Sequence, residues 1–116
     1  DFFISIHCNS NLSPKPNGSE ILYYDYKFND INAKDLAMIF SNQLDSETSL
    51  KRNSLQKRQD DDIFILENCK VPAVLIEVGY LSNYKDLNYL IKQENIDKAA
   101  KAIYQGIMEA YEVIGG

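Results

Sequence analysis

Two segments of the chain carry an almost continuous run of apolar, β-branched and aromatic residues, which is typical of buried strands. The first covers residues 1–7 and ends at His7, and the second covers residues 71–80 and contains Glu77. The second run opens with Pro72, which is tolerated at the start of a strand. Both segments are therefore predicted to be core strands, and a charged or titratable side chain, His7 or Glu77, stands near the carboxyl end of each.

Weaker patterns fill the chain between these two strands. Residues 19–24 alternate between two faces and predict a strand that we expect to pair beside the first one. Residues 63–66 predict another short strand. Positions 46–62 are polar and lack periodicity, so they are predicted to form an exposed connection with a short helix at most. Residues 9–18 are rich in Asn, Ser, Pro and Gly, which predicts a loop.

Apolar residues at helical spacing mark three further segments. A helix is predicted from Asp30, a suitable N-cap, to about Leu44, and its buried stripe comprises Ala33, Ala37, Phe40 and Leu44. Residues 84–91 predict a short helix and residues 95–114 a long one. The expected buried face of the long helix comprises Ile96, Ala100, Ile103, Ile107, Ala110 and Ile114.

The alternation of strands and helices predicts an α/β fold with a mainly parallel twisted sheet and helices on both faces. A chain of 116 residues holds one domain at most. The first core strand begins at Asp1, so we expect a piece of a longer protein in which the N-terminal strand or strands are missing. An uncovered sheet edge would follow, and such an edge favours self-association between copies.

Composition and charge exclude several classes of function. The formal net charge is −5, which offers little to replace the counterions of a phosphate backbone, so no nucleic-acid binding is expected. No apolar run approaches the roughly 18 residues that span a bilayer, so no membrane insertion is expected. Cys8 and Cys69 lack zinc-finger or disulfide-framework spacing, and we expect both to be small buried side chains.

His7 and Glu77 are the candidates for chemistry. Each stands near the carboxyl end of a predicted strand, and that edge of a parallel sheet is where sites assemble. A histidine and a glutamate that converge there suit a metal ligand and a general base. Two simpler interpretations stay open, namely a structural role for His7 and an ion pair between Glu77 and a lysine or arginine, which would offset the cost of burying a carboxylate.

Four segments of the chain together resemble a known family. They read FISIHCNSN at 3–11, GSEILYY at 18–24, VPAVLIEVGYLSNYKDLNYL at 71–90 and IDKAAKAIYQGIMEAY at 96–111. Their order and spacing are similar to those of the zinc-dependent N-acetylmuramoyl-L-alanine amidases, the autolysin and sporulation type of peptidoglycan hydrolase. The first segment resembles the family's Ser-Ile-His-x-Asn strand, and the third resembles its Pro-Ala-Val-Leu-x-Glu-x-Gly-Phe/Tyr-x-Ser-Asn strand and turn.

The resemblance implies that His7 is a zinc ligand and that Glu77 is the catalytic carboxylate. The supporting or substrate-binding positions that it implies are Asn9, Glu20, Gly79, Ser82 and Asn83. Enzymes of this family cleave the amide between N-acetylmuramic acid and the L-alanine of the stem peptide, with a zinc-activated water and a glutamate base. The implied partner is peptidoglycan, and the implied location is the cell wall or spore cortex of a Gram-positive bacterium, or release as a phage lysin.

The chain departs from the family pattern in its metal ligands. Family members carry two further ligands, a His in a turn and a Glu on a helix, and both precede the motif that opens this chain. Because catalytic zinc usually has three protein ligands, this chain lacks two of them. Glu20, Asp25 and Cys8 are the local candidates to replace the missing ligands, but Cys8 should face away from His7, and Glu20 starts rather than ends its strand. We therefore expect residues 1–116 to be an incomplete catalytic domain that binds zinc weakly or not at all and is inactive alone.

Two other functions stay open from the sequence. One is a non-catalytic peptidoglycan-binding or regulatory module, and the other is a zinc peptidase that cuts within the stem peptide. The presence of both His7 and Glu77 favours the amidase over the binding module, because a binding module has no need for a buried glutamate.

Overall fold

The computed structural model describes residues 1–24, 27–28, 31–58 and 69–114. Its elements, in chain order, are β1 (Phe3–Asn9), β2 (Glu20–Tyr24), β3 (Lys27–Phe28), β4 (Ile31–Asn32), α1 (Ala33–Glu47), β5 (Gln56–Arg58), β6 (Ala73–Tyr80), α3 (Tyr84–Leu90) and α4 (Gln93–Ile114). The strand predicted at 63–66 and the helix cap predicted at Asp30 lie outside the described residues. Helix α1 is capped by Asn32, whose side chain accepts a hydrogen bond from the backbone N–H of Asp35.

The main sheet has the strand order β1-β6-β2-β5. Strand β6 pairs in parallel with β1 and antiparallel with β2, and β2 pairs in parallel with β5. The α/β class with a mainly parallel sheet is thus confirmed. The prediction that β2 pairs beside β1 is wrong, because β6 lies between them. Strand β5 forms within the segment that was predicted to be a polar connection.

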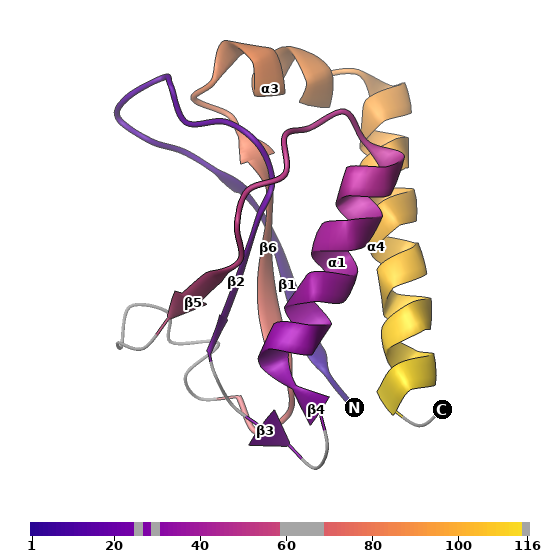
Figure 1. Cartoon of the computed structure of the whole chain (residues 1–116). Helices are drawn as coiled ribbons and strands as arrows, with labels where there is room; N and C mark the ends of the chain where they lie inside the picture. Colours follow the sequence, from indigo (N-terminus) through magenta and orange to yellow (C-terminus); the bar gives the residue numbers. More distant parts are fainter. Residues whose placement is uncertain (25–26, 29–30, 59–68, 115–116) are drawn as a thin grey trace.

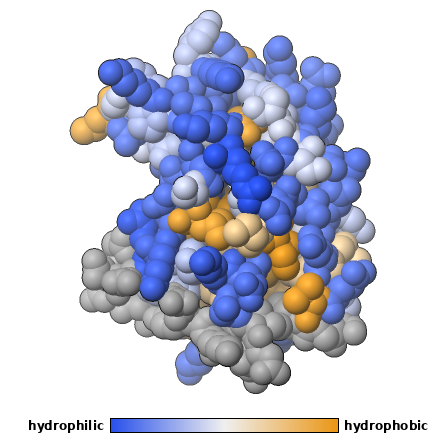
Figure 2. Space-filling view, viewed as in Figure 1, coloured by the Kyte–Doolittle hydropathy of each residue, from blue (hydrophilic) through white to orange (hydrophobic). Residues whose placement is uncertain are grey.

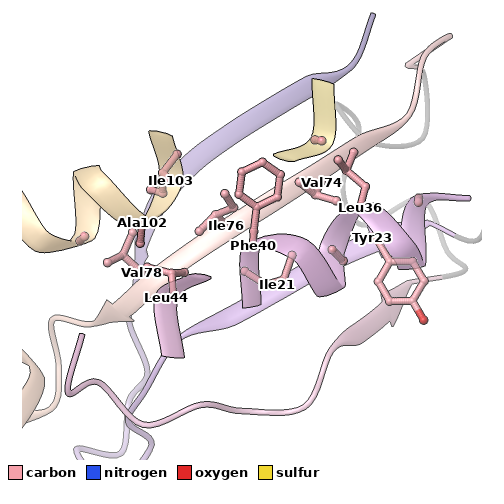
Figure 3. Packing of buried hydrophobic residues seen from close by; sticks show 14 of the residues in the cluster. Ile21, Tyr23, Leu36, Phe40, Leu44, Val74, Ile76, Val78, Ala102 and Ile103 are labelled. Carbon is pink, nitrogen blue, oxygen red and sulfur yellow. The ribbon is translucent and has the colours of Figure 1, made fainter. Parts of the chain in front are cut away.

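Helices α1 and α4 lie side by side on one face of the sheet (Figure 1). The core between them and the sheet centres on Phe40, which is fully buried next to Val74 and Ile76 of β6 (Figure 3). A Cβ at Gly106 would lie 2.5 Å from Cδ1 of Phe40, so this glycine allows α4 to approach α1 closely. The sequence predicted helices on both faces, and both long helices in the described ranges lie on this one.

The opposite face of the sheet carries a smaller buried cluster of Leu22, Tyr24, Ala73 and Leu75. The surface seen in the orientation of Figure 1 is mostly hydrophilic, and hydrophobic side chains reach it in a narrow band across the middle (Figure 2). Among the described residues, no helix combines the length and the hydrophobicity of a membrane-spanning segment.

Helix α4 is only partly buried along its predicted apolar face. Ile103 and Ala110 are buried as predicted, whereas Ile96 and Ile107 are 42% and 38% exposed. These two isoleucines and Ala100 line an apolar groove of about 550 Å³, to which Ile6 and Cys8 of β1 also contribute. The expectation that both cysteines are buried is wrong, because Cys8 is exposed and Cys69 is partly exposed.

Candidate active site

His7, Glu77 and Glu20 form a row across three neighbouring strands. Glu77 of β6 is the register partner of His7 in β1 and of Glu20 in β2. Register partners project their side chains to the same side of a sheet, so all three side chains share one face. Glu20 begins its strand as predicted, but the prediction that this places it away from the site is wrong, because β2 runs antiparallel to β6 and begins beside Glu77.

A β-bulge follows Glu77 in β6. His7 pairs with Glu77 and Asn9 pairs with Tyr80, so two steps along β1 match three steps along β6. An extra residue of this kind changes the direction of the side chains that follow it. Tyr80 is thereby brought to the face of Glu77, and its hydroxyl donates a hydrogen bond to Oε1 of Glu20 over 2.7 Å.

The carboxylate of Glu77 is poorly solvated. Its Oε2 atom is buried and has no hydrogen-bond partner among the described residues. Burial raises the pKa of Glu77, the nearby His7 lowers it, and the negative charge of Glu20 raises it further. A carboxylate with a raised pKa and a free oxygen is suited to accept a proton from a reacting group.

The imidazole of His7 is exposed at the end of β1, and its Nε2 atom lies 2.6 Å from the hydroxyl oxygen of Ser5. Within the described ranges, no three His, Cys, Asp or Glu side chains come together as metal ligands. His7 can therefore supply one imidazole ligand to zinc, beside the carboxylate of Glu77. The described residues do not form a complete zinc centre by themselves. Cys8 lines the groove on the α4 side, facing away from His7 as predicted, and Asp25 lies outside the described residues.

The turn after β6 holds the loop that follows β1. The backbone N–H of Asn11 donates to Oγ of Ser82 over 2.9 Å, and Nδ2 of Asn83 donates to the carbonyl of Pro14 over 2.8 Å. The backbone carbonyl of Asn9 accepts a hydrogen bond from the N–H of Leu81. Asn9, Ser82 and Asn83 thus lie together at the carboxyl edge of β1 and β6.

Asp86 is a buried residue of this region that the sequence pattern did not reveal. It is 2% exposed, and its Oδ2 atom accepts hydrogen bonds from the backbone N–H groups of Gly18 and Tyr80, at 2.7 Å and 2.9 Å. Gly79 packs against the same residue, because a Cβ there would lie 3.1 Å from Leu90 and 3.4 Å from Oδ2 of Asp86. Asn83 caps α3 by accepting a hydrogen bond from the N–H of Asp86, and no local sequence pattern points to the distant partner Gly18.

The chain is similar in sequence to known proteins of one family. The family model described as N-acetylmuramoyl-L-alanine amidase matches residues 1–109. The chain is 33% identical over 111 residues to the N-acetylmuramoyl-L-alanine amidase LytC of Bacillus subtilis. The matched region covers 96% of this chain and 22% of LytC. It is 32% identical to the germination-specific N-acetylmuramoyl-L-alanine amidase of the same organism, over 96% of this chain and 45% of that protein.

A solved structure agrees with the sequence relatives. The catalytic domain of CwlV, an N-acetylmuramoyl-L-alanine amidase from Bacillus (Paenibacillus) polymyxa var. colistinus, superposes with a TM-score of 0.83 at 30% identity, over 97% of this chain and 58% of that domain. The chain thus spans less than half the length of the two sequence relatives and somewhat more than half of a solved catalytic domain. The expected resemblance is confirmed, and the chain belongs to the N-acetylmuramoyl-L-alanine amidase family.

Proposed function

We propose that the full-length protein carrying these residues hydrolyses the amide bond between N-acetylmuramic acid and the L-alanine of peptidoglycan stem peptides. The observation that carries this proposal is the row of His7, Glu77 and Glu20, in which one buried oxygen of Glu77 has no hydrogen-bond partner in the part of the chain that the structure describes. Family membership supplies the substrate class. An unpartnered buried carboxylate costs stability, so a non-catalytic binding module offers no reason for it.

In this proposal Glu77 is the general base. Its free oxygen takes a proton from the attacking water and later returns that proton to the leaving amine of L-alanine. The low solvation that raises the pKa of Glu77 also strengthens its tendency to hold that proton during the reaction. Asn9, Gly79, Ser82 and Asn83 support the site by fixing the loop and the turn on either side of the reacting groups.

His7 is the proposed zinc ligand of this chain. Its imidazole lies at the strand end beside Glu77, where a metal ligand is in reach of the base. When bound, zinc polarises the scissile carbonyl and lowers the pKa of a water molecule. The remaining ligands are proposed to come from residues outside this chain, so that residues 1–116 are an incomplete catalytic domain.

Zinc content distinguishes this proposal from a site that the chain completes by itself. After dialysis against trace zinc, elemental analysis of residues 1–116 is expected to give far less than one zinc per chain, because a single imidazole holds the metal weakly. His7→Ala serves as the background control. Near-stoichiometric zinc that disappears in His7→Ala would contradict the proposal that further ligands come from outside this chain.

Muropeptide analysis tests the bond that is cut. Digestion of purified peptidoglycan by the full-length protein is expected to release stem peptides with free L-alanine amino termini. New termini between other amino acids would identify a peptidase, and the absence of any new terminus would identify a binding or regulatory module.

The proposed partners and location follow from the substrate. Peptidoglycan lies outside the cell membrane, so the protein is proposed to act in the cell wall or spore cortex of a Gram-positive bacterium, or as a phage lysin. For residues 1–116 on their own, a second copy is a further proposed partner, because β1 pairs only with β6 among the described strands and so presents its other edge. A monomeric mass in light scattering at high protein concentration would contradict this self-association.

A further inference from the structure

The hydroxyl of Tyr80 is a polar group that the proposed reaction does not use. Tyr80 is 7% exposed, and its hydroxyl donates to Oε1 of Glu20 over 2.7 Å. The bond depends on the β-bulge in β6, because regular alternation would send Tyr80 and Glu77 to opposite faces. The bulge therefore brings a hydrogen-bond donor to the face where the site lies.

Glu20 has reason to be held in place. It stands directly opposite Glu77 in the antiparallel pairing of β2 and β6, and like charges in that position repel one another. The terminal torsion of a glutamate is broad, so its carboxylate turns easily unless a donor fixes it. Without such a donor, only charge repulsion from Glu77 keeps the Glu20 carboxylate from turning along the row toward His7.

We propose that Tyr80 is a positioning residue that acts through Glu20. By donating to Oε1, the hydroxyl holds the Glu20 carboxylate at the β2 side of the row and leaves Glu77 as the carboxylate that faces the reacting water. An O–H donor to an ionised carboxylate forms a short, strong hydrogen bond, which suits this task. The inference rests on the proposed amidase function and adds a residue to it.

The protonation state of Tyr80 supports its role as a donor. Burial, the hydrogen bond to Glu20, and the charges of Glu20, Glu77 and Asp86 together raise the pKa of Tyr80 to about 12. The hydroxyl therefore keeps its proton throughout the pH range in which an extracellular hydrolase works.

A double-mutant cycle on the full-length, zinc-loaded protein tests the inference. Tyr80→Phe is expected to lower kcat by about 10-fold, the equivalent of one hydrogen bond to a charged group, and to change KM by less than about twofold. In the Glu20→Gln background the same change is expected to have no further effect on kcat, because the carboxylate that needs holding is gone. Tyr89→Phe is the matched control, since among the described residues the Tyr89 hydroxyl accepts a single long hydrogen bond, over 3.4 Å, from the N–H of Ser49.

The outcomes separate this inference from the proposed function. Equal loss of kcat from Tyr80→Phe in both backgrounds would assign Tyr80 a packing role and overturn the inference, as would unchanged kcat in the single variant. If the wild-type protein releases no L-alanine amino termini, the proposed function has failed. NMR titration of a ¹³Cζ-labelled Tyr80 then still tests the contact, because Glu20→Gln should lower the pKa of Tyr80 from its value of about 12, and an unchanged pKa would overturn it.

Discussion

Glu77→Gln in the full-length protein is expected to lower the rate of amide hydrolysis by about 10³-fold, while zinc remains bound. The glutamine amide keeps the size of the side chain but cannot accept the proton of the attacking water. Release of L-alanine amino termini from purified peptidoglycan measures the rate, and elemental analysis measures the zinc.

Two other variants serve as comparisons for Glu77→Gln. His7→Ala is expected to lose both zinc and activity, because it removes a metal ligand rather than the base. Glu94→Gln, at an exposed position in the first turn of α4, is the matched control and should leave the rate unchanged. A rate for Glu77→Gln close to that of Glu94→Gln would remove Glu77 from the role of base.

The same substitution is expected to stabilise the zinc-free protein at neutral pH. The pKa of Glu77 is raised in the folded state, mainly by burial, so its contribution to stability is fully present below the usual glutamate pKa and is lost as the pH rises through the raised value. Glutamine carries no charge and avoids this loss. Urea unfolding should therefore show Glu77→Gln to be more stable than wild type at pH 7, with a smaller difference at acidic pH.

The sequence predicted the structure correctly where the residues of a single segment determine its conformation and its buried face. The apolar runs before His7 and around Glu77 predicted β1 and β6, and the parallel pairing of these strands brings the two residues into register. The stripe containing Phe40 likewise predicted the buried face of α1. Each of these predictions depends on local periodicity and on burial, which the residue pattern records directly.

The misses all depend on contacts between distant segments. No local pattern shows that β6 separates β1 from β2, and this arrangement is what sets Glu20 opposite Glu77. The bulge that turns Tyr80 toward Glu20 likewise arises from the pairing of β1 with β6. Ile96 was predicted to be buried because helical periodicity marks an apolar face without showing what covers it, and here that face lines an open groove.

Asp86→Ala is expected to lower the free energy of unfolding by about 3 kcal/mol, because two buried N–H groups lose their acceptor at about 1 to 3 kcal/mol each. Those groups belong to Gly18, in the loop before β2, and to Tyr80, at the end of β6. Urea unfolding at pH 7 measures the loss. Asp97→Ala, at an exposed position of α4, is the control and should change stability by less than about 0.5 kcal/mol.

Asp86→Asn refines the same test, because an amide oxygen in the place of Oδ2 can still accept both hydrogen bonds without the charge. We therefore expect Asp86→Asn to lose less stability than Asp86→Ala. A loss for Asp86→Ala no larger than that for Asp97→Ala would show that neither N–H depends on this carboxylate. The expected ranking instead identifies the buried carboxylate of Asp86 as the link between the loop before β2 and the end of β6, which carries Tyr80. The alignment of Glu20 and Glu77 then depends, through Tyr80, on a residue outside their row.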